Sequence, residues 1–255
     1  DLDSKTRYIP KKVIPSNRGE FKNKIAIIGG GPAGLSCAYY LALTGYRPIV
    51  FEKNEKPGGM LTYGIPSYKL EKDVVEAEID IIRTLGVEIK CGVEVGKDIT
   101  LDELRKDGYE AFYIAIGCQG SRKSGVDGED ADGVMSAVDI LHEIAENHDL
   151  DLKGNKTVVI GGGNVAVDVA RSTKRCGADV LGMFCLESRE EMPASEEEIF
   201  ETEDEGIQIN NGWGVKEILA ENGKVTGVVL KKCTSVKDAN GKFNPQYDEN
   251  DTQTI

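Results

Sequence analysis

The spacing of apolar positions changes along the chain, and each change predicts a new element of secondary structure. A β-branched run at residues 24–28 predicts a strand, and small and apolar residues at helical spacing follow at residues 35–44. A second apolar run at residues 47–52 ends in an acid. Short apolar runs are typical of strands, and spacings of three and four are typical of helices. The opening segment therefore predicts a strand, a glycine turn, a helix and a second strand.

The same alternation continues through the middle of the chain. Residues 72–85 predict an amphipathic helix, because Val75, Ile79, Ile82 and Leu85 recur at spacings of three and four. After it we expect a strand at 87–91, a short helix at 101–106, a buried strand at 111–116 and a helix at 138–147. Strands that alternate with helices predict a parallel sheet.

The opening pattern then begins again. A β-branched run at residues 157–160 precedes a second glycine-rich motif, a helix to about residue 175 and a strand at 179–185. The first motif starts at Gly29 and the second at Gly161, a separation that indicates one ligand-binding unit repeated at the scale of a domain. A hairpin is expected from residues 225–232 and the turn at Asn240-Gly241. We predict an α/β fold with two Rossmann-like dinucleotide-binding domains.

Charge and composition narrow the function. The 255 residues carry a formal net charge of −13, which repels phosphate backbones and anionic membranes, so we set nucleic acid aside. No apolar run approaches the roughly 18–20 residues of a membrane helix, and residues 1–12 lack the apolar core of a secretory signal. The six cysteines are scattered, with no Cys-x-x-Cys pair, so we expect a reducing cytoplasm and no metal site.

The first glycine motif has the context that dinucleotide binding requires. Gly29-x-Gly31-x-x-Gly34 follows a strand and opens a helix. The first glycine permits a sharp turn, the second lets the backbone approach a pyrophosphate, and the third lets helix and strand pack closely. Glu52 follows at the end of the next strand, where a carboxylate can accept the ribose hydroxyl protons. Pro32, Ala33 and Lys53 complete this expected site.

A second glycine pair follows the acid after a short loop. Gly58-Gly59 follows Glu52, and this order of an acid and then a glycine pair resembles that of flavoproteins that bind two dinucleotides. A glycine pair allows backbone to approach the flavin side of a cofactor, although a plain turn after Pro57 has the same composition. The continuation favours FAD at the first motif.

The second glycine motif repeats the spacing of the first with one change. Gly161-x-Gly163-x-x-Ala166 has alanine at the third position, which is common in nicotinamide-binding units. The position of the acid falls near Glu187, just after the next predicted strand. Gly162, Asn164 and Val165 lie within the motif. Asn164 either helps to orient the nicotinamide or caps its own helix.

Three longer stretches of sequence are more specific than the glycine motifs. The first runs from Pro57 through Tyr-Gly-Ile-Pro to Leu70, the second covers residues 162–171, and the third is Ser188-Arg-Glu-Glu-Met-Pro-Ala194. Together they resemble the small-subunit family of glutamate synthase and its relatives, which include the flavin and NADPH half of dihydropyrimidine dehydrogenase. The resemblance extends from about residue 24 to the end of the chain.

The resemblance implies an architecture and a chemistry. An FAD domain would be interrupted by an inserted nicotinamide domain, with an arm or linker at residues 1–22, the first part of the FAD domain at 23–150 and an incomplete nicotinamide domain at 151–255. Hydride would pass between NAD(P)H and FAD, and electrons would leave to iron–sulfur clusters or a partner subunit. Gly59, Met60 and Lys69 would lie along the flavin, and Gly117 would mark the crossing between domains. Val95 joins the expected FAD site, and Ser188 and Arg189 join the nicotinamide site. Lys69 is equally compatible with a solvated lysine, and Tyr63 with simple packing.

The chain departs from the family pattern in three ways. Members that use NADPH carry two arginines where this chain has Leu186 and Glu187. Arginines would bind a 2′-phosphate, whereas a glutamate would repel it and bind a free 2′-hydroxyl, so we expect NADH as cofactor, with NADPH still possible through Arg189. The cysteine-rich cluster domain of the family is absent before Lys24, and no glycine–aspartate segment that would close the FAD site appears before Ile255. We therefore expect a fragment of a longer protein.

Other functions remain open at this stage. No general acid or base is expected, because hydride transfer is the chemistry of the cofactors themselves. A thioredoxin reductase would need a Cys-x-x-Cys pair, which the sequence lacks. A non-catalytic assembly module that keeps the fold is the alternative from a different class. The acidic residues 190–205 fit a docking face or a solvated helix.

Overall fold

The computed structural model describes residues 20–121, 123–147 and 150–255. The predicted arm at residues 1–22 lies outside the described residues except for its last three. Cα packing divides the chain into two compact units with the boundary between Gln119 and Gly120. The domain boundary expected near residue 150 stays a prediction.

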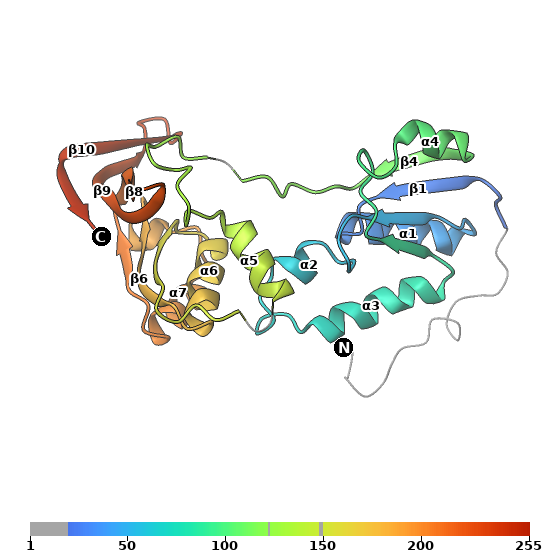
Figure 1. Ribbon diagram of the computed structural model, residues 1–255, viewed down its shortest axis with the longest axis horizontal. Helices are drawn as coiled ribbons and strands as arrows, with labels where there is room; N and C mark the ends of the chain where they lie inside the picture. Colours follow the sequence, from blue (N-terminus) through green and yellow to red (C-terminus); the bar gives the residue numbers. More distant parts are fainter. Residues whose placement is uncertain (1–19, 122, 148–149) are drawn as a thin grey trace. The chain divides into compact units, whose positions relative to one another are not determined.

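The first unit is a parallel sheet with helices on both faces (Figure 1). Its strands lie in the order β3-β2-β1-β4, and every neighbouring pair is parallel. The strands are β1 (Lys24–Ile28), β2 (Ile49–Glu52), β3 (Glu88–Cys91) and β4 (Tyr109–Ile114); the helices are α1 (Pro32–Thr44), α2 (Met60–Tyr63), α3 (Lys72–Thr84) and α4 (Leu101–Lys106).

Alternate residues of the central strands pack on opposite helices. Ile27 and Val50 pack with Ala38 of α1, and Ile79 of α3 packs beside Leu35, which also belongs to α1. On the other face, Ile28 and Phe51 pack with Leu104 of α4. Because successive side chains of a strand point to opposite faces, the continuous apolar runs of β1 and β2 fill both faces of this sheet.

Helix ends in the first unit follow local chemistry. Thr100 and Glu103 form a reciprocal capping box at the start of α4. In α3, Asp73 lies in the first turn and Arg83 in the last, so both charges favour the helix dipole.

The second unit is built in three layers. A parallel sheet of β5 (Lys156–Ile160), β6 (Asp179–Cys185) and β7 (Ile209–Asn211) forms the middle layer. One face packs against α5 (Ala137–Glu146), α6 (Asn164–Arg175) and α7 (Glu196–Asp204). The other face packs against an antiparallel sheet of β8 (Trp213–Glu221), β9 (Lys224–Lys237) and β10 (Phe243–Thr254), through Phe184 and Leu230. A 3₁₀ turn, η2 (Arg189–Glu191), precedes α7.

The α/β class with parallel sheets is confirmed, and two local expectations are corrected. The strand expected to be buried at residues 111–116 is β4, whose Tyr113 and Ile114 are 43% and 55% exposed. β4 lies at the edge of the sheet among the described residues, and an apolar run reads alike in central and edge strands. Strand β8 was missed, although Asn222-Gly223, both at positive φ, is a strong hairpin signal between β8 and β9.

No helix in the described part of the chain is both long and apolar enough to cross a membrane.

Candidate functional site: two glycine turns

The first glycine turn, residues 29–34, lies where three strands end. Gly29 has φ +105°, and its N–H donates to the carbonyl of Phe51 at 2.8 Å. A Cβ at this position would lie 2.3 Å from the carbonyl oxygen of Ala115. Both the backbone conformation and the space therefore require glycine at the first position of the motif.

The third glycine lets helix α1 begin directly on the turn. A Cβ on Gly34 would lie 2.0 Å from the carbonyl oxygen of Gly29. Gly31 is the N-cap of α1 and supplies no side-chain cap. The first N–H groups of a helix have no partners within the helix, and the helix dipole favours an anion beside them. Pro32 is the first residue of α1.

Glu52 is buried against the first glycine turn. Its side chain is 4% exposed, and its two oxygens accept hydrogen bonds from the N–H of Gly30 at 2.7 Å and of Asn54 at 2.9 Å. A carboxylate offers about four lone-pair sites, so Glu52 retains acceptor capacity for ribose hydroxyls. Lys53, beside it, is exposed.

The structure brings the glycine pair Gly58-Gly59 onto the first turn. The N–H of Gly58 donates to the carbonyl of Gly30 at 2.8 Å. Gly59 has φ +55°, and a Cβ there would lie 2.9 Å from Cα of Gly31. Met60, which begins α2 directly after this pair, is partly exposed. The two glycine segments are separated along the sequence, but in the fold their backbones lie against each other and form one continuous surface.

Three side chains hold the loop that carries this glycine pair. The buried Tyr63 hydroxyl accepts from the N–H of Lys56 at 2.9 Å, and the Thr62 hydroxyl donates to Pro57 at 2.7 Å. The ammonium of Lys72 donates to the carbonyl of Leu61 at 2.8 Å and to that of Ile65. Burial lowers the pKa of Lys72.

Lys72 is a residue that the sequence analysis missed. It reads as an ordinary solvated lysine at the start of an amphipathic helix, and only the fold places the two carbonyls beside it.

The remaining residues expected on the FAD side have varied surroundings. Val95 packs against the apolar cluster that contains Phe51 and Tyr109. Lys69 is half-buried, and its N–H donates to the carbonyl of Pro66 at 3.0 Å. Gly117 is exposed with φ +70°.

The second glycine turn, residues 161–166, repeats the geometry of the first. Gly161 has φ +137°, and its N–H donates to the carbonyl of Phe184 at 2.9 Å, as Gly29 does to Phe51. A Cβ on Gly161 would lie 3.2 Å from the Cβ of Ala166. This turn is therefore wide enough for a methyl group at its third position.

The carboxylate beside the second turn comes from a different place in the chain. Phe51 in β2 is paired with the last residue of β1, and Phe184 in β6 is paired with the last residue of β5. The residue after Phe184, Cys185, therefore occupies the position that Glu52 has in the first unit. A Cβ on Gly162 would nevertheless lie 3.1 Å from Oε2 of Glu187 and 3.0 Å from the Cβ of Cys185. Glu187 thus reaches back to the position that Glu52 occupies in the first unit. Burial, reinforced by the charge of Glu187, raises the pKa of the Cys185 thiol to about 11.

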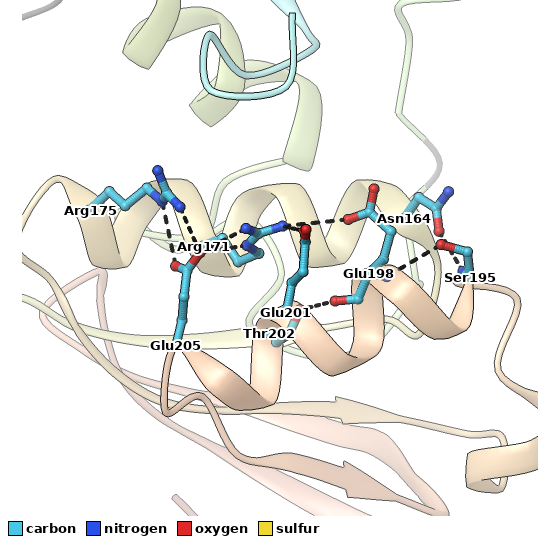
Figure 2. A network of polar contacts seen from close by, with 8 residues as sticks. All are labelled: Asn164, Arg171, Arg175, Ser195, Glu198, Glu201, Thr202 and Glu205. Carbon is cyan, nitrogen blue, oxygen red and sulfur yellow. Dashed lines mark hydrogen bonds and ion pairs between the residues drawn. The ribbon is translucent and has the colours of Figure 1, made fainter.

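Residues 192–195 rest directly on the second glycine turn. The N–H of Ala194 donates to the carbonyl of Gly162 at 3.1 Å, and that of Ser195 donates to Oδ1 of Asn164 at 3.0 Å (Figure 2). The N-cap of α6 is Gly163, so Asn164 does not cap its own helix but ties the turn to α7. Val165 is 53% exposed.

Two further residues of the expected nicotinamide site already have partners. Arg189 pairs with Glu203 at 3.1 Å, and the Ser188 hydroxyl lies 3.2 Å from a carboxylate oxygen of Glu191.

Comparison with known proteins decides the family. The model of the pyridine nucleotide-disulphide oxidoreductase family matches residues 23–241. This chain belongs to that family. It is 41% identical over 228 residues to the beta subunit of the NADP(+)-dependent formate dehydrogenase of Moorella thermoacetica, which covers 87% of this chain and 32% of that protein. It is 36% identical over 233 residues to the small chain of the Escherichia coli NADPH glutamate synthase, which covers 86% of this chain and 49% of that protein.

The expected resemblance to the glutamate synthase small subunit is confirmed, and the chain spans about a third to a half of the length of these curated relatives. Solved structures agree on the fold. FprA of Mycobacterium tuberculosis in complex with NADPH has a TM-score of 0.75 at 20% identity, covering 91% of this chain and 68% of that one. Thioredoxin reductase of Lactococcus lactis has a TM-score of 0.63 at 22% identity, covering 89% and 75%.

This member of the pyridine nucleotide-disulphide oxidoreductase family carries no dithiol motif in its sequence. Burial raises the pKa of Cys37, Cys91, Cys176 and Cys233, so these thiols stay protonated at neutral pH. These four cysteines therefore fit packing better than thiol–disulfide exchange.

Proposed function

We propose that this chain holds FAD at the first glycine turn and a nicotinamide dinucleotide at the second, as part of an oxidoreductase that passes hydride between them. Family membership supports an oxidoreductase that uses FAD and NAD(P)H. The cofactors themselves supply the hydride chemistry. The chain's own residues bind the two cofactors, orient them and exclude water from them. None of these residues needs to act as a general acid or base.

One observation carries this proposal: within the described part of the chain, nothing requires the middle residue of each turn to be glycine. Gly31 has φ −77° and Gly163 φ −95°, which any residue adopts. Among the described residues, a Cβ on Gly31 would meet only Gly59 and one on Gly163 only Pro193, each at 3.9 Å. Neither strain nor packing explains the missing side chain, whereas the close approach of a pyrophosphate does. The residues present therefore fit a dinucleotide at both turns.

The remaining contacts follow from this placement. At the first turn, Glu52 would accept ribose hydroxyls, the N-terminal N–H groups of α1 would face the pyrophosphate, and Gly59 with Met60 would lie toward the flavin. Lys53, Lys69, Val95 and Gly117 remain proposals on the FAD side. At the second turn, the proposed contacts are Gly161 to Ala166, Glu187, Ser188 and Arg189.

We further propose that NADH is preferred over NADPH. Glu187 reaches Gly162 as Glu52 reaches Gly30, which is the place for a carboxylate that binds a ribose 2′-hydroxyl. Arg189 is the cation near Glu187 in the sequence that could bind a 2′-phosphate, and its side chain is already paired with Glu203. The relatives named here carry NADP or NADPH in their names, so this preference sets the chain apart from them.

Replacing Leu186 and Glu187 by arginine tests the preference. The double variant is expected to move the ratio of kcat/KM for NADPH over NADH upward by at least roughly 10- to 100-fold, since even one charge-assisted hydrogen bond to the 2′-phosphate contributes about 1.5–3 kcal/mol. Glu187→Gln, which removes the repulsion without adding a cation, should fall between wild type and the double variant. Unchanged cofactor ratios in both variants would contradict the proposal.

Electrons would then leave the flavin to another subunit or domain. Relatives of this chain are named as a beta subunit and a small chain, which supports a larger catalytic or iron–sulfur partner. We also place the protein in the cytoplasm, where scattered thiols stay reduced.

The visible spectrum tests the whole proposal. The protein is purified and titrated anaerobically with NADH and then with NADPH, while the flavin band near roughly 450 nm is followed. Bleaching by NADH supports FAD, hydride transfer and the preference together. Bleaching by NADPH alone supports the activity and contradicts the preference. A protein without flavin favours a non-catalytic assembly module.

A further inference from the structure

A buried arginine joins helix α6 to helix α7. The side chain of Arg171 is 6% exposed, and two carboxylates of α7 and that of its C-cap residue surround the guanidinium (Figure 2). Its Nε donates to Glu205 at 2.8 Å, its Nη1 donates to Glu201, and Glu198 lies 3.7 Å away. We call Arg171, Arg175, Glu198, Glu201 and Glu205 the carboxylate network.

The network fixes α7 at one register along α6. Glu198, Glu201 and the C-cap residue Glu205 recur at spacings of three and four, so they lie along one face of α7 and its C-terminal end. A buried guanidinium is strongly destabilising unless it is paired and hydrogen-bonded. A slide or rotation of α7 would break several of these contacts at once, and the loss of Arg171 would leave clustered carboxylates to repel one another.

The other end of α7 meets the second glycine turn. Residues 192–195 lead into α7, and Ser195 is its N-cap. Ala194 and Ser195 donate their N–H groups to Gly162 and Asn164 of the turn. The register of α7 therefore determines where residues 192–195 lie on the turn.

We propose that Arg171 is a positioning residue for the nicotinamide dinucleotide: through α7 it holds residues 192–195 on the second glycine turn. The inference rests on the proposed function of that turn. Arg171 and Asn164 stand two helical turns apart on α6, about 10 Å along the helix axis, so the effect of Arg171 on the turn passes through α7. Sequence motifs give no sign of this role, because the carboxylates belong to a different helix and lie far from Arg171 along the chain.

Hydrogen exchange of single amides tests the positioning without any nucleotide. In Arg171→Met, the amides of Ala194 and Ser195 are expected to lose protection on the order of 10-fold or more, while β5 and β6 keep theirs. Arg175→Met is the graded comparison: it removes one positive charge from the same helix at a side chain that is 47% exposed and pairs with Glu205 alone among the three network carboxylates, so the two amides should lose much less protection than in Arg171→Met. Arg171→Lys should restore part of it.

A milder variant keeps the test decisive if Arg171→Met unfolds the second unit. Glu201→Gln leaves Arg171 in place and removes a carboxylate that is 44% exposed. It should loosen the same two amides by a smaller factor. Unchanged protection of both amides in Glu201→Gln and Arg171→Met would overturn the proposal, as would an equal loss over the whole second unit in both.

A double-mutant cycle checks that the two ends communicate. Asn164→Ala removes the acceptor of the Ser195 amide, and the protection of the Ala194 amide is then measured with and without Arg171→Met. Distant and independent changes add, whereas changes that act through one element do not. We expect the double variant to lose little more protection than the stronger single variant, and strict additivity would contradict the proposal.

Measuring the affinity for NADH distinguishes a failure of this inference from a failure of the proposed function. Arg171→Met should weaken binding of NADH on the order of 10- to 100-fold, because small misplacements in a binding site have effects of this size, and should leave flavin content unchanged. If the wild type binds neither NADH nor NADPH, the proposed function fails, and the exchange result still decides whether Arg171 positions the turn. Loosened amides with unchanged NADH affinity would overturn the role in binding.

Discussion

At the scale of single residues, the two glycine turns differ in the space that they leave for a side chain at the third position of the motif. The third position of the first turn is Gly34, where a Cβ would lie 2.0 Å from the carbonyl oxygen of Gly29. The third position of the second turn is Ala166, whose methyl group is buried there. Backbone atoms cannot yield as a flexible side chain can, so the first turn excludes even a methyl group.

Exchanging these two residues gives a matched pair of variants. Gly34→Ala should destabilise the first unit by about 1–3 kcal/mol through overpacking and should reduce flavin content. Ala166→Gly should cost only about 1 kcal/mol, from backbone entropy and a small lost contact, and should leave flavin content unchanged. Denaturant unfolding and the visible spectrum measure both effects. Equal behaviour of the two variants would contradict the difference in room between the turns.

At the scale of elements, the attachment of α7 depends on ionised carboxylates. Burial alone would raise the pKa of Glu205, but hydrogen bonds and charge from Arg175 and Arg171 outweigh it and hold this pKa below its usual value. A carboxylate with a lowered pKa in the folded state stabilises the fold above its unfolded pKa and loses that contribution as pH falls through its folded pKa.

Glu205→Gln should therefore be less stable than wild type at pH 7 by roughly 1–3 kcal/mol, the size of lost charge-assisted hydrogen bonds. The difference should shrink as the pH falls below about 4.5, because the wild type also loses the charge there. Denaturant midpoints between neutral and acidic pH measure this. Glu203→Gln on the same helix removes an exposed ion pair with Arg189 and should change stability by less than about 1 kcal/mol. A Glu205→Gln deficit that stays constant down to pH 3 would count against the assignment.

At the scale of the whole molecule, each compact unit has its own glycine turn and its own apolar clusters. Gly29 lies in the first unit and Gly161 in the second, and both have positive φ. Damage to one turn should therefore leave the ligand of the other in place.

Two alanine variants should separate the ligands. Gly29→Ala combines backbone strain with a clash against Ala115, at a cost of about 1–3 kcal/mol for the strain alone, and should lose flavin but keep nicotinamide dinucleotide binding. Gly161→Ala should do the reverse. Flavin absorbance and calorimetric titration with NADH report the two ligands independently. Loss of both ligands in either variant would contradict separate sites.

Features that depend on local sequence were predictable from the sequence. The limits of β1 and β6 agree with their apolar runs, and α3 and α5 begin and end within about one residue of the expected positions. Both glycine turns and the acid Glu52 were found because a strand, a turn and a helix that follow one another leave a local pattern. The hairpin at Asn222-Gly223 had such a signal too, and was overlooked.

The sequence by itself determined the class of fold, the two glycine turns and the family, because each is recorded in local spacing along the chain. Only the tertiary structure decided which distant groups meet: Gly59 against Gly31, Lys72 on its two carbonyls, Glu187 in the place of Glu52, and Arg171 among the acids of α7. It also decided that, in the part of the chain that the structure describes, the apolar strand β4 lies at a sheet edge with exposed side chains. The physical reason is that such contacts join segments whose separation along the chain carries no periodic signal, so they exist only once the sheets and helices have packed.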